Sequence, residues 1–233
     1  MVREPKIKAA AEESSDMTFW EKFRSLSEEA WNEVKSRPKY TFCFICLLVT
    51  RLVSVLFSVY MQLWVMSFVK SGVISSEEEG DRIYMTIVGF AMAATLVVAP
   101  AFGLLSDKAD PRVIVPTSFF LRGMIAFSFR FIDDPTELHA YILSITMIVV
   151  SVIQFLCVEV LFMRNMKANI RGTLTGLAFF FGSVGTTTFA LIGGILFDKV
   201  APWAPFMVVG TADATVFLVC ITFLAFGLIK RDD

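Results

Sequence analysis

Five polar side chains lie inside stretches of the sequence that are otherwise apolar. Arg51 and Glu159 carry opposite charges, as do Arg122 and Asp213, and Gln154 adds an amide. A charged side chain inside an apolar helix is costly in a membrane, and such residues commonly mark an ion or substrate pathway, a proton relay or a paired contact. The chemistry that these residue types indicate is charge pairing, together with solute or proton binding.

The two charge pairs have different expected roles. For Arg51 and Glu159 we expect an ion pair that also contacts a substrate or a proton, although a purely structural pair explains them equally well. Arg122 and Asp213 lie 91 residues apart in the chain. For this intramembrane charge pair we favour a structural role over a role in transport.

No catalytic or metal-binding arrangement is apparent in the sequence. The segment 182–185, Gly-Ser-Val-Gly, superficially resembles an intramembrane protease motif, but the only histidine, His139, lies in a linker beyond another apolar stretch. One histidine also excludes a bis-histidine haem, and there is no phosphate-binding loop or cluster of metal ligands. The sequence predicts a protein without enzymatic activity, cofactor, metal site or direct use of ATP.

The composition indicates a membrane protein. Of 233 residues 56% are hydrophobic, including 24 Phe and 11 Met, whereas soluble domains have about 45–50% apolar residues. The net charge of −1 gives no indication of a nucleic-acid partner, so the partner that the composition does indicate is a lipid bilayer. Four cysteines lie in apolar stretches, where we interpret them as apolar filler and not as a metal or redox site: Cys43, Cys46, Cys157 and Cys220.

Six apolar stretches are long enough for helices that cross a membrane, which takes about 20 residues each. An amphipathic interfacial helix is predicted before them over residues 18–38, where Thr18 and Glu21 have capping-box spacing. Packing on a soluble partner is the alternative for that helix. Residues 1–17 are predicted to form a disordered tail. The predicted spans are 40–68, 83–105, 112–132, 140–163, 172–197 and 205–229.

A nine-residue segment occurs twice, at 103–111 and at 194–202, with identical residues at five positions. Each copy closes an apolar stretch and predicts a short charged turn between two helices. The same offset superimposes Arg122 on Asp213. The six-span region, 39–230, is therefore predicted to consist of two three-helix repeats, 39–132 and 139–229.

The distribution of basic residues predicts the topology. Of the 21 Lys and Arg residues, 15 fall on the side of the two termini, and three fall on the opposite side. Both termini of this multi-pass protein are therefore expected to be cytoplasmic. Because three spans per repeat is an odd number, the repeats are expected to have inverted orientations. The three basic residues on the outer side are Lys70, Arg82 and Lys199.

The first copy of the repeated segment carries a resemblance to a known family. Gly103, Asp107, Lys108 and Arg112 resemble, by type and spacing, the signature loop of the major facilitator superfamily. The segment 110–111, Asp-Pro, departs from that loop, where the family favours glycine and a basic residue. The glycines at both ends of the fifth span and the helix before the first span also resemble this family. The match covers residues 18–230 and fits the carboxyl-terminal half, with six of the usual twelve spans.

The resemblance implies an all-α fold of six transmembrane helices, which is half of a major-facilitator bundle. The first and fourth spans would line the substrate path, and the third and sixth would support it. The second and fifth would contact a second six-span half, which is either a missing amino-terminal half or a second copy. The small residues of the second and fifth spans serve that contact or packing within this half.

The same resemblance implies roles for individual residues. Tyr60, Gln62 and Trp64 could bind a polar substrate, although an interfacial aromatic belt explains the two aromatic residues equally well. The implied groups are a substrate or ion pathway of Arg51, Gln62, Gln154 and Glu159, a gating loop of Gly103, Asp107, Lys108 and Arg112, and a repeat-equivalent turn of Gly194, Asp198 and Lys199.

Two functions of different kinds are consistent with these observations. The leading hypothesis is a secondary active transporter, or half of one, that moves a small organic solute by alternating access, with a proton as the candidate coupling ion. The alternative is a transporter-derived membrane subunit that serves as a scaffold or binds a partner. Arg51 and Glu159 favour the first hypothesis, whereas six spans in place of twelve favour the second or a fragment.

Overall fold

The computed structural model describes residues 18–36, 38–106, 110–165 and 170–225, and all regular structure within these ranges is helical. Six helical segments are long and apolar enough to cross a membrane. The expected all-α fold with six membrane-spanning helices is therefore confirmed.

The first span is interrupted by a π-helical turn and is followed by five further long helices. The helix before it, α2, covers Phe19–Ser36, and its first turn is capped as expected, because Thr18 N donates to the Glu21 carboxylate at 2.9 Å. The first span comprises α3 (Pro38–Val55), η1 (Leu56–Tyr60) and α4 (Met61–Lys70), and the others are α5 (Glu77–Ser106), α6 (Pro111–Ser128, continued by the 3₁₀ turn η2, Phe129–Phe131), α7 (Leu138–Asn165), α8 (Arg171–Lys199) and α9 (Ala204–Ala225).

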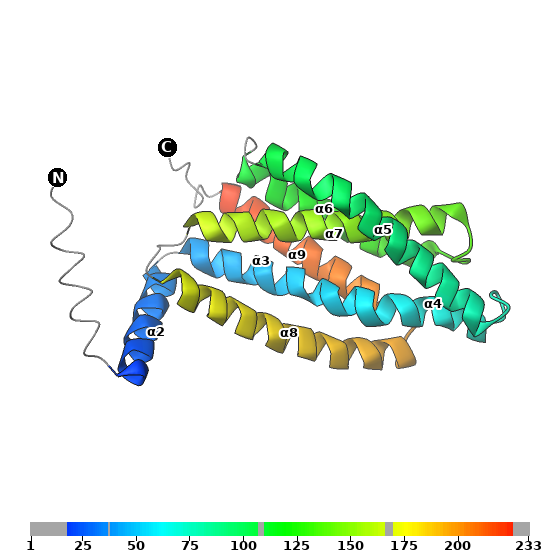
Figure 1. Ribbon diagram of the computed structural model, residues 1–233, viewed down its shortest axis with the longest axis horizontal. Coiled ribbons are helices and arrows are strands. Elements are labelled where there is room, and N and C mark those ends of the chain that lie inside the picture. Colours follow the sequence, from blue (N-terminus) through cyan, green and yellow to red (C-terminus); the bar gives the residue numbers. More distant parts are fainter. Residues whose placement is uncertain (1–17, 37, 107–109, 166–169, 226–233) are drawn as a thin grey trace.

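The spans form two layers. Figure 1 shows a front row in the order α5, α7, α3 with α4, and α8, and a back layer of α6 and α9. Within the front row each helix packs on its neighbour, while α6 covers α7, and α9 covers α3 and contacts α8. The first and fourth spans are therefore central, and the second and fifth spans form the two edges of the front row. The side of this row that turns away from α6 and α9 is called the front face.

Three loops lie together at the end of the bundle opposite α2, at residues 71–76, 132–137 and 200–203 (Figure 1). The first of them begins where Gly72 ends α4 with a φ of 82°. Gly72 N donates to Val69 O, and Val73 N donates to Phe68 O, which is the hydrogen-bond pattern of a glycine-terminated helix. Glycine is needed at this position because other residues rarely adopt a positive φ.

Two boundaries differ from the sequence prediction. The predicted linker over residues 70–82 is shorter, because α5 begins at Glu77. Glu79 N donates to Ser76 Oγ at 3.2 Å, and Ser75 N donates to the Glu79 carboxylate at 3.1 Å, so this reciprocal cap starts the helix in a charged segment. The turn predicted at Asp198-Lys199 follows directly after these residues, because both belong to the last turn of α8 and the loop lies at residues 200–203. Asp107-Lys108 lies outside the described residues.

Candidate functional site

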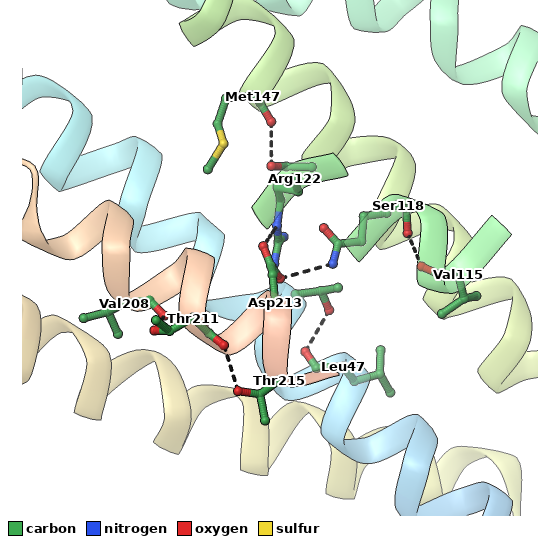
Figure 2. Close-up of polar contacts among 12 residues, drawn as sticks. Leu47, Val115, Ser118, Arg122, Met147, Val208, Thr211, Asp213 and Thr215 are labelled. Carbon is green, nitrogen blue, oxygen red and sulfur yellow. Dashed lines mark hydrogen bonds and ion pairs between the residues drawn. The ribbon is translucent and has the colours of Figure 1, made fainter. Parts of the chain in front are cut away.

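Arg122 and Asp213 form a buried ion pair between α6 and α9 (Figure 2). Both side chains are fully buried. Arg122 Nε donates to Asp213 Oδ2 at 2.7 Å, and Arg122 Nη2 donates to Oδ1, so the contact is bidentate. Gln154, also fully buried on α7, approaches Oδ1 with Nε2 at 3.5 Å. Three helices therefore converge on one carboxylate in the interior of the bundle.

This polar cluster of Arg122, Gln154 and Asp213 lies between two hydrophobic cores. On α6, Phe119 belongs to one core and Ile125 to the other, with Arg122 between them. The same succession holds on α7 around Gln154 and on α9 around Asp213. The cluster is thus one polar layer between α7 and the two helices of the back layer, at the level where the two cores meet.

The pair is costly to bury and more costly to break. An isolated charge at the centre of a membrane helix costs about 2.5–3.5 kcal/mol on insertion scales, and removing one partner of a buried pair typically costs about 3–5 kcal/mol. Glycine brings the helices close here, because a Cβ at Gly123 would lie 3.3 Å from Asp213 Cβ and 3.5 Å from the Gly210 carbonyl oxygen. The α6–α9 contact is therefore shaped around the pair.

The positive charge of Arg51 is stabilised by other contacts than that of Arg122. Its guanidinium carbon lies 5.0 Å from the ring centre of Phe155 on α7 and 4.3 Å from that of Phe179 on α8. Among the described residues no ion pair joins Arg51 to Glu159, so the expected pair is not formed. Each cation–π contact contributes about 0.5–2 kcal/mol, which offsets the cost of inserting the charge but leaves the charge itself unneutralised.

Glu159 and Gln62, the remaining members of the expected pathway, have separate surroundings. Glu159 lies one helical turn beyond Phe155 on α7, and its Oε2 is buried without a hydrogen-bond partner among the described residues. Gln62 Nε2 donates to Asp81 Oδ1 of α5 at 3.3 Å, at the end of the bundle that carries the three described loops. The four predicted pathway residues therefore do not form one connected network.

Tyr60 and Trp64 are core residues, so the expectations of substrate binding and of an interfacial belt are both wrong for them. Trp64 is 1% exposed and packs edge-on against Phe129 and Phe206, whose rings stack on each other at 4.2 Å. Tyr60 ends the π-helical turn, and its hydroxyl donates to the Ala190 carbonyl of α8. A π-turn inserts one extra residue and rotates the subsequent residues around the helix.

The glycines in the middle and at the end of α8 pack on the first span, whereas those in its first turns do not. A Cβ at Gly182 would lie 3.1 Å from Arg51 Cγ, and one at Gly193 would lie 2.7 Å from the Tyr60 ring. At Gly172 and Gly176, in contrast, a Cβ would meet nothing within 4 Å. Of the two interpretations of these small residues, packing within this half holds for Gly182 and Gly193, whereas the first turns of α8 remain open.

The part of the expected gating loop that the structure describes includes the N-terminal cap of α6. Asp110 is the N-cap of α6, and its Oδ1 accepts a hydrogen bond from Arg112 N at 2.9 Å, with Pro111 at the first helical position. Aspartate followed by proline suits these two positions, which explains the departure from the family pattern. Gly103 lies within α5, and Gly194 lies in α8, with the Tyr60 hydroxyl 3.8 Å from where its Cβ would be.

The comparisons with known proteins agree with this architecture. The sequence model of the Major Facilitator Superfamily matches residues 1–190. Magnetosome protein MamZ of Magnetospirillum gryphiswaldense is 22% identical over 213 residues, which cover 88% of this chain and 32% of the relative. Magnetosome protein MamZ of Paramagnetospirillum magneticum gives the same values. Magnetosome protein MamH of the latter organism is 22% identical over 205 residues, covering 87% of this chain and 46% of the relative.

The chain thus spans from 32% to 46% of the length of these curated relatives. No solved structure matches it. The family match covers most of the chain, and six helices have the length and composition of membrane spans. The chain therefore belongs to the major facilitator superfamily.

Proposed function

We propose that this chain is half of a secondary active transporter, which moves a small organic solute across a membrane by alternating access. The observation that carries the proposal is the front row, in which the first and fourth spans lie side by side between α5 and α8. A solute path along this front face would be lined by α3 and α7, and α5 and α8 would flank it. Both flanking helices are the least buried of the six spans.

The exposure of α5 and α8 supports a second six-span half as the partner. Large apolar side chains are exposed along both helices, including Leu96 and Val97 of α5 and Phe180 and Leu191 of α8. Exposed apolar surface in a membrane can face lipid or another helix bundle. The greater length of the relatives supports a second bundle, which is either another part of a longer polypeptide or a second copy of this chain.

An inverted repeat accounts for the neighbours of each helix. If the two repeats exchange places, the contact of α5 with α7 becomes that of α8 with α3, and both contacts are present. The contact of α6 with α9 maps onto itself. Arg122 and Asp213, which are equivalent at the offset of 91 residues, meet in that contact, as equivalent positions do when they lie close to a pseudo-two-fold axis.

Proton coupling would involve Glu159, and gating would involve Asp107. Glu159 is the one carboxylate on the fourth span, beside the proposed path, and its Oε2 has no hydrogen-bond partner among the described residues, so we assign the coupled proton to it. Asp107 would accept hydrogen bonds from a neighbouring helix end in one state and release them in the other. Both termini and Asp107 would face the cytoplasm.

A non-transporting membrane subunit is the second candidate function. The observation in its favour is that Gln62 bonds to Asp81 and Arg51 stacks on aromatic rings, so that the proposed pathway residues are not linked to one another. Such a chain would serve as a scaffold that binds a partner through its exposed helices. The names of the relatives make the magnetosome the first place to look for either function.

Flux in proteoliposomes tests the proposal. The purified chain, alone and with any membrane protein that co-purifies with it, is reconstituted, and entry of a panel of labelled organic acids, amino acids and sugars is measured with and without a pH gradient. A transporter gives flux that Asp107→Asn reduces while the amount of inserted protein is unchanged. Glu159→Gln should abolish accumulation driven by the pH gradient. Flux equal to that of empty liposomes in both preparations would support the scaffold instead.

A further inference from the structure

We propose that Arg51, held between Phe155 and Phe179, binds an oxyanionic group of the transported solute, a carboxylate or a phosphate. The inference rests on the proposed function, because it takes the front face along α3 and α7 as the solute path. It goes further by naming the chemical class of the solute and the side chain that recognises it.

The position of the guanidinium group is set by its two neighbours. Phe155 comes from α7 and Phe179 from α8, and these helices flank α3 on opposite sides in the front row. Because α9 covers the back of α3, a group on α3 that reaches rings from both flanks lies on the front face. Ser54, three residues after Arg51 on α3, is exposed, and Phe179 is 49% exposed. The guanidinium group is thus reached from the front face.

The cation–π contacts leave the N–H donors of the guanidinium group without a strong hydrogen-bond acceptor. A phenyl ring attracts the positive charge of an arginine but has no oxygen or nitrogen that could accept from its five N–H donors. Among the described residues no carboxylate forms an ion pair with Arg51. Arg51 therefore brings a positive charge and N–H donors into this span without a carboxylate to receive them.

The contrast with Arg122 shows what is missing at Arg51. Arg122 receives a bidentate carboxylate from Asp213, which is the geometry that a guanidinium group favours. Arg51 has the same side chain, also in a membrane span, but two phenyl rings in place of the carboxylate. A ligand oxyanion would occupy the place that Asp213 occupies beside Arg122.

Gly182 and Glu159 complete the proposed site around Arg51. Gly182 of α8 leaves room for the arginine stem, since a Cβ there would lie 3.1 Å from Arg51 Cγ. Glu159 comes one turn after Phe155 on α7 and has a buried oxygen without a partner among the described residues. A solute that carries a hydrogen-bond donor beside its oxyanion would satisfy both side chains.

Chemical protection tests the site directly. Phenylglyoxal, which modifies arginine, is applied to the purified chain in a zwitterionic detergent, and labelling of each arginine is measured by mass spectrometry. Acetate and inorganic phosphate are compared with chloride at equal ionic strength. Saturating acetate or phosphate should slow the labelling of Arg51 about tenfold. Arg130 is the internal control, because it also stacks on an aromatic ring, Trp203 at 4.6 Å, but at the end of the bundle.

Substitutions at Arg51 and Arg130 provide the second part of the test. Arg51→Gln should abolish the rise in unfolding temperature that acetate or phosphate produces, and Arg51→Lys should weaken binding about tenfold because it keeps the charge but loses the planar fork. Arg130→Gln should bind like the unchanged protein. If Arg51 resists labelling in chloride, or is labelled at the same rate in all three salts, the inference is wrong. Protection by phosphatidylglycerol vesicles alone would instead assign a lipid headgroup site.

The two proposals can fail separately. Flux of a neutral or cationic solute without oxyanion protection of Arg51 would leave the transporter in place and remove the oxyanion site. Protection of Arg51 in a chain that moves no member of the solute panel would retain the site on a subunit that does not transport.

Discussion

Arg122 and Arg51 show two ways in which the chain carries an arginine inside a membrane span. Arg122 is neutralised by Asp213 within the bundle, whereas Arg51 lies against two aromatic rings at the front face. The first arrangement leaves no charge for a ligand and joins two helices of the back layer. The second leaves a charge for a ligand at the boundary of three helices. Arg122 therefore contributes to the contact between α6 and α9, and the role that we propose for Arg51 is ligand binding.

The buried pair predicts strongly non-additive mutations. Arg122→Met and Asp213→Leu should each lower the free energy of unfolding by about 3–5 kcal/mol, because each leaves an uncompensated charge. The double variant should lose much less than the sum of the two, since it contains no buried charge. Unfolding in mixed micelles measures the three values.

The control for this cycle is the exposed pair of Arg24 and Glu28 on α2, which are 3.1 Å apart. Arg24→Gln should change the free energy of unfolding by less than about 1 kcal/mol. Additive losses for Arg122 and Asp213 would show that the pair does not act as a unit.

Asp134, in the loop before α7, is predicted to titrate at unusually low pH. The Thr136 hydroxyl and Thr136 N donate to Asp134 Oδ1 at 2.6 and 2.8 Å, and these bonds lower the pKa of the carboxyl group. The folded-state pKa lies below the unfolded one, so the contribution to loop stability is present above the unfolded pKa and is lost as pH falls through the folded pKa. Thr136→Val should raise the pKa, as ¹³C carboxyl titration would show; an unchanged pKa would contradict this.

At the scale of the helices, the contact between the first span and α8 depends on where glycines fall. Tyr60 is held by its hydrogen bond to Ala190 and by the rings of Phe189 and Phe197. Gly193 lies beneath the Tyr60 ring, and the space between them is too small for a side chain. Because Gly193 has no side chain, the Tyr60 ring fits between the first span and α8 and bonds to α8 while the two helices stay close together.

Two glycine substitutions in α8 should have opposite effects. Gly193→Ala would place a Cβ 2.7 Å from the Tyr60 ring, and because Tyr60 is held in place, overpacking should cost about 1–3 kcal/mol. Gly176→Ala meets nothing within 4 Å and should be neutral or stabilising by up to about 1 kcal/mol, since alanine favours helix over glycine. The unfolding temperatures of the two variants in detergent, compared with that of the unchanged protein, test this prediction. Equal shifts for both would contradict the close packing of α8 on the first span at Gly193.

The sequence predicted the elements better than their contacts. The six spans can be read from apolar length alone, and the pairing of Arg122 with Asp213 could be anticipated because one offset relates both them and the repeated segments. The start of α5 at Glu77 was missed because the charges there outweighed the cap signal of Ser76 and Glu79.

Arg51, Tyr60 and Trp64 were misplaced for a different physical reason. Their surroundings depend on how helices rotate and slide against one another, and a helical pattern continued through residues 56–60 fails because the π-turn rotates the rest of the span. Pairing Arg51 with Glu159 relied on opposite charge and equal depth. With 24 phenylalanines in the chain, the sequence does not indicate which of them lie beside Arg51.

At the scale of the whole molecule, the start of α6 and the end of α8 lie at opposite ends of the bundle (Figure 1), which predicts the outcome of topology mapping. Single cysteines at Asp110, in the turn before α6, and at Val200, after α8, should react with an impermeant maleimide from opposite sides of the membrane, with Asp110→Cys on the cytoplasmic side. The four native cysteines are buried and give little background. Labelling of both positions from one side would rule out the inverted repeat.

The pairing across 91 residues also has a consequence in time. A ribosome adding about 5–20 residues per second makes α6 roughly 5–20 s before α9 delivers the aspartate. During that interval α6, the least hydrophobic of the six spans, holds an unpaired arginine. A nascent chain arrested after Lys199 should therefore leave α6 outside the bilayer in many molecules, as a glycosylation reporter would show, and synthesis of α9 should draw it in. The order of synthesis makes the last span the one that completes the insertion of the third.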